Sequence, residues 1–223
     1  MSQTGIFNGR VLVPYSYGCY GYTRGSGKTW HGGIDLVGAD DPTIRMPFYT
    51  VNGERKSISG TVVTARKVDR STGNLTWEWG WYVCVKLDAN QTPDAVNYLY
   101  FCHCDSLLVQ VGQKVKSGDA LAIMGNSGNA VYNNPPYKHC HLEVRATATG
   151  RGLDPTAYAG VLNAAGTYGN TDPLPEASNG RLQVITIGPV SQGDADAILA
   201  LCVQRGLDKL GLYSSKWADE LED

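Results

Sequence analysis

The stretch His139-Cys-His-Leu-Glu-Val-Arg145 is a short run of residues that favours a β-strand. Its two histidines are two residues apart, so both imidazoles should lie on one face of the strand and Cys140 on the other. Four further runs have strand character and are separated by turn-forming Gly, Asn, Asp and Ser residues: 60–65, 79–87, 98–103 and 121–124. Short strands at close spacing predict an antiparallel β-sheet or sandwich and disfavour a repeated βαβ fold.

The composition supports a mainly β globular protein. The chain has 223 residues, which suits one substantial domain with a small appendage. Its 27 glycines, 10 prolines, 13 tyrosines and 5 tryptophans indicate many turns and strands. A hydrophobic content of 42% excludes a disordered chain, and a net charge of −2 argues against a nucleic-acid or anionic-membrane binder.

Three segments are expected along the chain. Residues 1–165 carry the predicted β domain, and residues 166–180 have the Gly, Pro, Asn and Ser content of a linker. Residues 181–223 predict a small α/β module with a strand and a helix, whose apolar stripe contains Ala195, Ile198, Leu199 and Cys202. A module of this size has a marginal core of its own, so we expect it to dock on the first domain, to dimerise, or both.

The N-terminus and the cysteines indicate the cellular compartment in which the protein is expected. The first ten residues lack a basic segment followed by an apolar one, so no signal peptide is expected, and no apolar run is long enough for a membrane helix. The six cysteines are scattered, which favours free buried thiols. Cys102 and Cys104 are spaced like a metal-binding pair, but no second pair matches them.

The four histidines and one aspartate contain the donors of a zinc hydrolase. His31 and Asp35 are four residues apart, and the two glycines between them disfavour a helix and predict a turn that enters a strand. His103 is expected to end the strand 98–103, and His139 and His141 share a strand face. Two imidazoles with one carboxylate suit catalytic zinc, and further histidines can act as acid, base or oxyanion stabiliser. Each histidine alone is more often structural; the joint pattern favours a metal site.

Four blocks in order carry a family resemblance: His31–Asp35, Tyr100–His103, Val111–Gly128 and His139–Arg145. Together they resemble the lysostaphin-type (LytM-like) zinc metallopeptidases, which cut peptide bonds in bacterial peptidoglycan. The resemblance covers about residues 28–158 and implies an antiparallel β catalytic domain with a substrate groove.

The resemblance also implies a role for each site residue. It implies a Zn2+ ion held by His31, Asp35 and His141. His103 and His139 would then be the catalytic histidines that do not bind the metal, orienting and deprotonating water and stabilising the tetrahedral oxyanion.

Some positions depart from the family pattern. Cys104 and Cys140 stand where the family usually has leucine, and strand alternation should point both away from the metal. The segment 67–81 is longer than expected, and its aromatic residues would either bind substrate or contribute to the core. Residues 125–128 resemble the loop that lines the substrate groove.

The expected function is therefore a zinc metalloendopeptidase that hydrolyses peptidoglycan cross-links or stem peptides. The alternatives are a non-catalytic wall-binding or hydrolase-activating protein of the same fold, and a phage structural protein carrying a wall-degrading domain. A wall hydrolase without a signal peptide resembles phage or prophage endolysins, which stay in the cytoplasm until they are released to the cell wall. The expected partners are peptidoglycan peptides, without nucleic acid or integral membrane contact. The C-terminal module faintly resembles half of a SPOR-type peptidoglycan-binding domain, which would suit a homodimer.

Overall fold

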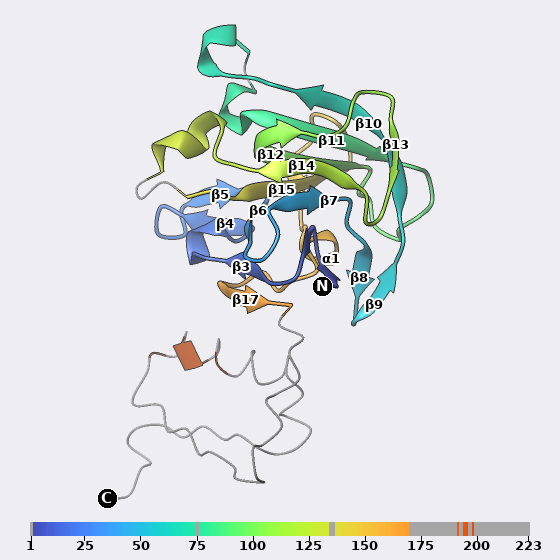
Figure 1. The fold of residues 1–223 in the computed structure, drawn as a ribbon. Helices are drawn as coiled ribbons and strands as arrows, with labels where there is room; N and C mark the ends of the chain where they lie inside the picture. The colour runs from blue at the N-terminus through green and yellow to red at the C-terminus, as the bar shows by residue number, and fades with distance from the viewer. Residues whose placement is uncertain are drawn as a thin grey trace, which may run out of the picture. The chain divides into compact units, whose positions relative to one another are not determined.

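A computed structural model describes residues 2–74, 76–133 and 137–169, together with 191, 194, 195 and 198 (Figure 1). The chain divides into two compact units, Met1–Thr171 and Asp172–Asp223. In the second unit Asp194, Ala195 and Ile198 are helical, and the backbone N–H of Asp194 donates to the Ser191 hydroxyl at 3.2 Å. The strand predicted over 181–188, and residues Leu199 and Cys202, lie outside the described residues.

The first unit is built on an eleven-stranded sheet in which every pairing is antiparallel (Figure 1). Along its main path the strands are β13 (Lys114–Lys116), β10 (Ser59–Arg66), β11 (Trp81–Leu87), β12 (Tyr98–Leu107), β15 (Cys140–Arg145), β6 (Ile34–Gly38), β3 (Val11–Val13) and β17 (Gly166–Tyr168). Three more strands branch from it: β14 (Ala120–Met124) between β12 and β7 (Thr43–Arg45), and β16 (Gly152–Leu153) beside β15. The prediction of a mainly β, antiparallel fold is confirmed.

Short hairpins and helical turns surround this sheet. The hairpins are β1 (Gln3–Thr4) with β2 (Phe7–Asn8), β4 (Gly21–Arg24) with β5 (Thr29–His31), and β8 (Tyr49–Val51) with β9 (Glu54–Lys56). The helical elements are η1 (Ser16–Gly18), η2 (Arg70–Thr72), η3 (Trp77–Trp79), η4 (Gly128–Tyr132) and α1 (Thr156–Ala159). Among the residues that the structure describes, no helix is long and apolar enough to cross a membrane.

The five predicted strands are present, and two of them differ from the predicted range by more than one residue at an end. β11 begins at Trp81 because the preceding residues Trp77–Trp79 form η3. β12 continues to Leu107, so His103 does not end its strand as predicted. In addition, Gly166–Tyr168 at the start of the predicted linker pairs with β3, and the Tyr168 ring is buried in the core.

Two apolar clusters cover opposite faces of the central strands. In β12, Leu99 and Phe101 belong to the main core, whereas Tyr100 and Cys102 belong to a smaller cluster with Tyr82 and Cys84 of β11. This alternation is what a strand with two buried faces requires. The five cysteines that the structure describes are free and buried, as predicted; Cys202 lies outside the described residues.

The alternation also bears on the cysteine pair at 102 and 104. Cys102 belongs to the smaller cluster, whereas Cys104 and Cys140 belong to the main core. Because Cys102 and Cys104 pack in different clusters, their spacing does not produce a shared metal site.

Candidate metal centre

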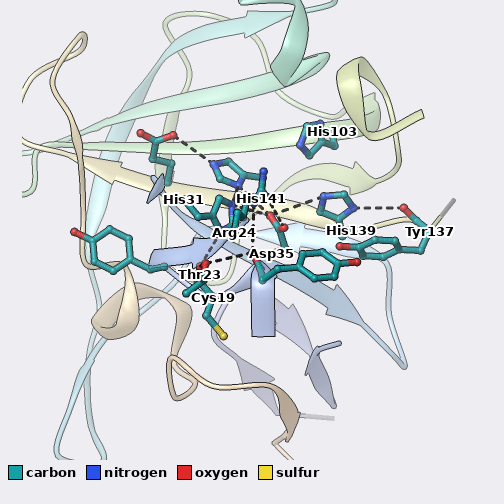
Figure 2. A network of polar contacts seen from close by, with 12 residues as sticks. Cys19, Thr23, Arg24, His31, Asp35, His103, Tyr137, His139 and His141 are labelled. Atoms are coloured by element: carbon teal, nitrogen blue, oxygen red, sulfur yellow. Dashed lines mark hydrogen bonds and ion pairs between the residues drawn. The ribbon is translucent and has the colours of Figure 1, made fainter. Parts of the chain in front are cut away.

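Three donor side chains meet where β5, β6 and β15 come together. His31 is the last residue of β5, Asp35 lies in β6, and β15 places His141 directly opposite Asp35 in the ladder. The Nε2 atom of His31 lies 2.9 Å from Nδ1 of His141. Oδ1 of Asp35 lies 3.0 Å from His141 Nδ1 and 3.3 Å from His31 Nε2. All three side chains are buried, and they converge in Figure 2.

The Gly32-Gly33 pair makes this convergence sterically possible. A Cβ atom on Gly33 would lie 2.3 Å from the Leu142 carbonyl oxygen and 2.9 Å from the His141 ring. A Cβ on Gly32 would lie 3.2 Å from Oε1 of Glu143. The glycines therefore let the turn between β5 and β6 approach β15 closely, as well as excluding a helix.

The donor set fits a tetrahedral metal ion. Zinc binds imidazole nitrogen and carboxylate oxygen at about 2.0–2.2 Å, so two donors of one tetrahedral ion lie roughly 3.3–3.6 Å apart. The three donor separations of 2.9, 3.0 and 3.3 Å are close to that range. Two imidazoles and one carboxylate leave a fourth position available, which is the pattern of catalytic zinc sites.

The outer hydrogen bonds fix the tautomer of His31 and hold the ring of His141. Nδ1 of His31 lies 2.8 Å from the Cys19 carbonyl oxygen, which can only accept, so Nδ1 carries the proton and Nε2 presents its lone pair. Nε2 of His141 lies 3.4 Å from Oε2 of Glu143, whose other oxygen accepts a 2.7 Å hydrogen bond from Nε of Arg145. Such outer partners orient metal-binding histidines.

The pKa values of the cluster residues are shifted because one buried carboxylate lies among imidazole rings. Burial by itself would raise the pKa of Asp35, but the hydrogen bond from Nδ1 of His141 holds that pKa well below its usual value. Burial likewise opposes protonation of His141, yet its bonds to Asp35 and Glu143 raise its pKa to about 9. In contrast, burial lowers the pKa of His31. A metal ion at this cluster would compete with the His141 proton.

A β-bulge directs His103 toward the same cluster. Trp81 pairs with Cys104 whereas Val83 pairs with Phe101, so β12 has one extra residue between these pairs. His103 lies in this bulge with a left-handed φ of 65°. Regular alternation would place His103 on the core face with Phe101, but the bulge brings its ring within 4.8 Å of the His139 ring and 6.0 Å of the His141 ring.

His103 and His139 differ in how firmly they are held. Nδ1 of His103 lies 2.9 Å from the Ser127 carbonyl oxygen, so Nδ1 carries the proton and Nε2 is a free acceptor. The His139 ring stacks on Tyr137 at 4.6 Å, and its Nδ1 lies 3.4 Å from the Tyr137 carbonyl, which is long for a hydrogen bond. Burial lowers the pKa of both histidines, that of His103 to about 3, so both are neutral at neutral pH.

The structure thus brings all five predicted site residues together, and it adds two charged residues and Tyr137 that sequence reasoning missed. Glu143 supports His141, and Arg24 contacts both His31 and Asp35 (Figure 2). Glu143 follows His141 by two residues on the same strand face, so alternation could have identified it. No comparable pattern in the sequence points to Arg24 or Tyr137.

A cavity of about 450 Å³ is lined in part by the loop that was expected to line the substrate groove. Ser127 and Gly128 line this cavity, and the Ser127 carbonyl is the partner of His103. Trp77 and Trp81 from the long segment also line it. Trp79 instead packs against aromatic rings of the smaller cluster. Trp77 thus serves both the cavity and the smaller cluster, whereas Trp81 lines the cavity and packs against the main core.

Comparison with known proteins finds similarity to one peptidase family over part of the chain. Residues 55–155 match the model of peptidase family M23. The match includes His103, His139 and His141, whereas His31 and Asp35 precede it. The lysostaphin catalytic domain from Staphylococcus simulans is 19% identical, over 65% of this chain and 90% of that chain, with a TM-score of 0.44. A variant catalytic domain of the prophage-encoded M23 protein EnpA from Enterococcus faecalis is 21% identical, over 63% and 87%, with a TM-score of 0.42.

Proposed function

We propose that this chain, whose residues 55–155 match the model of peptidase family M23, is a zinc-dependent endopeptidase acting on bacterial peptidoglycan. The observation that carries the proposal is the buried cluster of His31, Asp35 and His141, whose donor atoms all lie within 4.8 Å of one another. The cluster supplies the donors that a catalytic zinc ion takes, and the second pair of histidines lies beside it.

The proposed roles follow from the position of each side chain. His31, Asp35 and His141 would hold the ion. Bound zinc would supply Lewis acidity, which polarises a carbonyl group and makes water acidic enough to lose a proton near neutral pH.

The two remaining histidines would handle protons. His103 presents the lone pair of Nε2 and is held by Ser127, so it is suited to accept a proton from the attacking water. His139 has no strong partner at Nδ1, so either tautomer is accessible, and an N–H on the side of the substrate would stabilise the developing oxyanion. Burial lowers the pKa of both rings, so both are uncharged in the metal-free protein.

The proposed substrate is an extended peptide of the peptidoglycan, either a cross-link or a stem peptide. The cavity at the loop that holds His103 combines tryptophan rings with the small residues Ser127 and Gly128, which allow a peptide to approach the backbone closely. We further propose an endolysin-like role, with the protein held in the cytoplasm until its release to the wall and with a homodimer formed through residues 181–223.

The test combines metal analysis with digestion of purified sacculi. We expect one zinc ion per chain and new amino termini in the released peptides, identified by mass. His141→Ala should lose zinc and activity together, whereas His103→Ala should keep zinc and lose rate. Retention of zinc by His141→Ala with its loss from His103→Ala would reverse the assigned roles. Absence of both zinc binding and cleavage, even with added zinc, would refute the proposed endopeptidase activity.

A further inference from the structure

Arg24 places a permanent positive charge directly on the metal-donor cluster. It is the last residue of β4, and its Nη2 atom lies 2.9 Å from Nε2 of His31 and 3.0 Å from Oδ2 of Asp35. Its Nε atom donates to the Tyr17 carbonyl oxygen at 3.3 Å. The guanidinium group is therefore held at three points, two of which lie on residues of the proposed metal centre, His31 and Asp35 (Figure 2).

The contact with His31 uses the lone pair that a metal ion needs. Because Nδ1 of His31 donates to the Cys19 carbonyl, Nε2 carries the only lone pair of the ring. Arg24 has no acceptor atom, so its N–H must donate into this lone pair. A hydrogen bond to Nε2 and a metal bond at Nε2 are mutually exclusive, since each requires the same pair of electrons.

The contact with Asp35 stabilises a buried carboxylate. Asp35 is 1% exposed, and a buried carboxylate is costly unless it is paired. Among the residues that the structure describes, Arg24 is the only lysine or arginine in ion-pair contact with it. The neighbouring Arg145 pairs with Glu143 instead. Arg24 thus supplies a permanent positive charge beside Asp35 when no metal is bound.

Arg24 also lies where it can leave the cluster. Its side chain is 41% exposed, and it ends a strand that is followed directly by a turn. Three successive residues of that turn, Gly25, Ser26 and Gly27, have positive φ values. The guanidinium can therefore move toward solvent without removing a buried side chain from the core.

We propose that Arg24 is an internal competitor of the metal ion: it stabilises the metal-free centre through His31 and Asp35 and must be displaced when the centre is loaded. The inference rests on the proposed function, because it assumes that zinc is the ion of this site. It follows that the same contact has opposite effects on two measurable quantities, the stability of the metal-free protein and its affinity for zinc.

The test is the full-length variant Arg24→Gln, measured against wild type by competition for zinc with a chromophoric chelator. We expect zinc to bind about three- to tenfold more tightly, the range for a charged hydrogen bond discounted for partial exposure. Unfolding of the metal-free variant in excess chelator should occur at a lower temperature than in wild type. The zinc-loaded proteins should differ much less, because Arg24 has left the metal donors in loaded wild type and is absent from the variant.

Two further variants separate this mechanism from simpler ones. Arg151→Gln removes a nearby positive charge that stacks on Trp30 at 3.7 Å and touches none of the metal donors, so its zinc affinity should stay within twofold of wild type. Arg24→Met keeps the aliphatic bulk of the side chain and should behave like Arg24→Gln.

The outcomes distinguish this inference from the proposed function. Zinc binding that is weaker or unchanged in both Arg24 variants would overturn the competition and leave the metal centre intact. An equal gain in Arg151→Gln would overturn it in favour of a general charge effect. Failure of the wild-type protein to bind zinc would refute the proposed metal centre itself, and the competition with it.

Discussion

The substitution Glu143→Gln tests whether the second layer of the site tunes metal binding. The change keeps the size of a buried side chain and removes the charge that faces Nε2 of His141. Loss of an outer partner typically lowers metal affinity 10- to 100-fold. The His141–Glu143 contact is 3.4 Å, well beyond the usual 2.9–3.0 Å, so we expect the lower end, about tenfold or roughly 1.4 kcal/mol.

The assay is a zinc competition titration at neutral pH, with Glu54→Gln as the matched control. Glu54 is exposed on β9, so the same chemical change there should leave zinc affinity unaltered. The fold of Glu143→Gln should persist, because Arg145 also stacks over the rings of Trp79 and Tyr100, each at 4.9 Å. An unchanged affinity in Glu143→Gln, or an equal loss in Glu54→Gln, would refute the reasoning.

Two further predictions concern packing and pH. Gly33→Ala should destabilise the fold by about 1–3 kcal/mol through its clash with β15, whereas Gly166→Ala, which meets only the end of the Tyr168 side chain, should change the melting temperature little. Burial raises the pKa of the Cys104 thiol from 9.0 to about 12, so between these values the unfolded chain loses a proton that the folded protein keeps. The free energy of unfolding should fall with rising pH there, by up to about 1.4 kcal/mol per pH unit for this thiol, and urea titrations should give a shallower decline in Cys104→Ala; equal slopes would contradict the assignment.

The features that sequence predicted best depend on short-range periodicity. The two-residue spacing of His139 and His141 places both rings on one face of β15, because alternation is a property of the strand itself. The two glycines after His31 exclude a helix by backbone entropy, and the structure has a turn there. The antiparallel fold likewise follows from short strands joined by turn residues.

The features that sequence did not predict depend on contacts between distant segments. Arg24 reaches Asp35 from a separate hairpin, and no periodicity links a hairpin end to a neighbouring strand. The strand at 166–168 forms because β3 offers an unpaired edge and Tyr168 fills the core, whereas its local composition resembles a linker. Both depend on the tertiary arrangement, which overrides local preference.

The bulge at His103 shows how such a contact determines chemistry. A histidine with positive φ is unfavourable by itself, so the surrounding structure must maintain it. The Ser127 hydroxyl does so by bridging the two strands at the bulge: it accepts from the Trp81 backbone N–H at 2.9 Å and donates to the Cys104 carbonyl at 2.8 Å. The carbonyl of the same serine fixes the His103 ring. One residue on the loop after β14 therefore both completes the interrupted ladder and orients the side chain that the bulge exposes, which is why the position of His103 cannot be derived from its own strand.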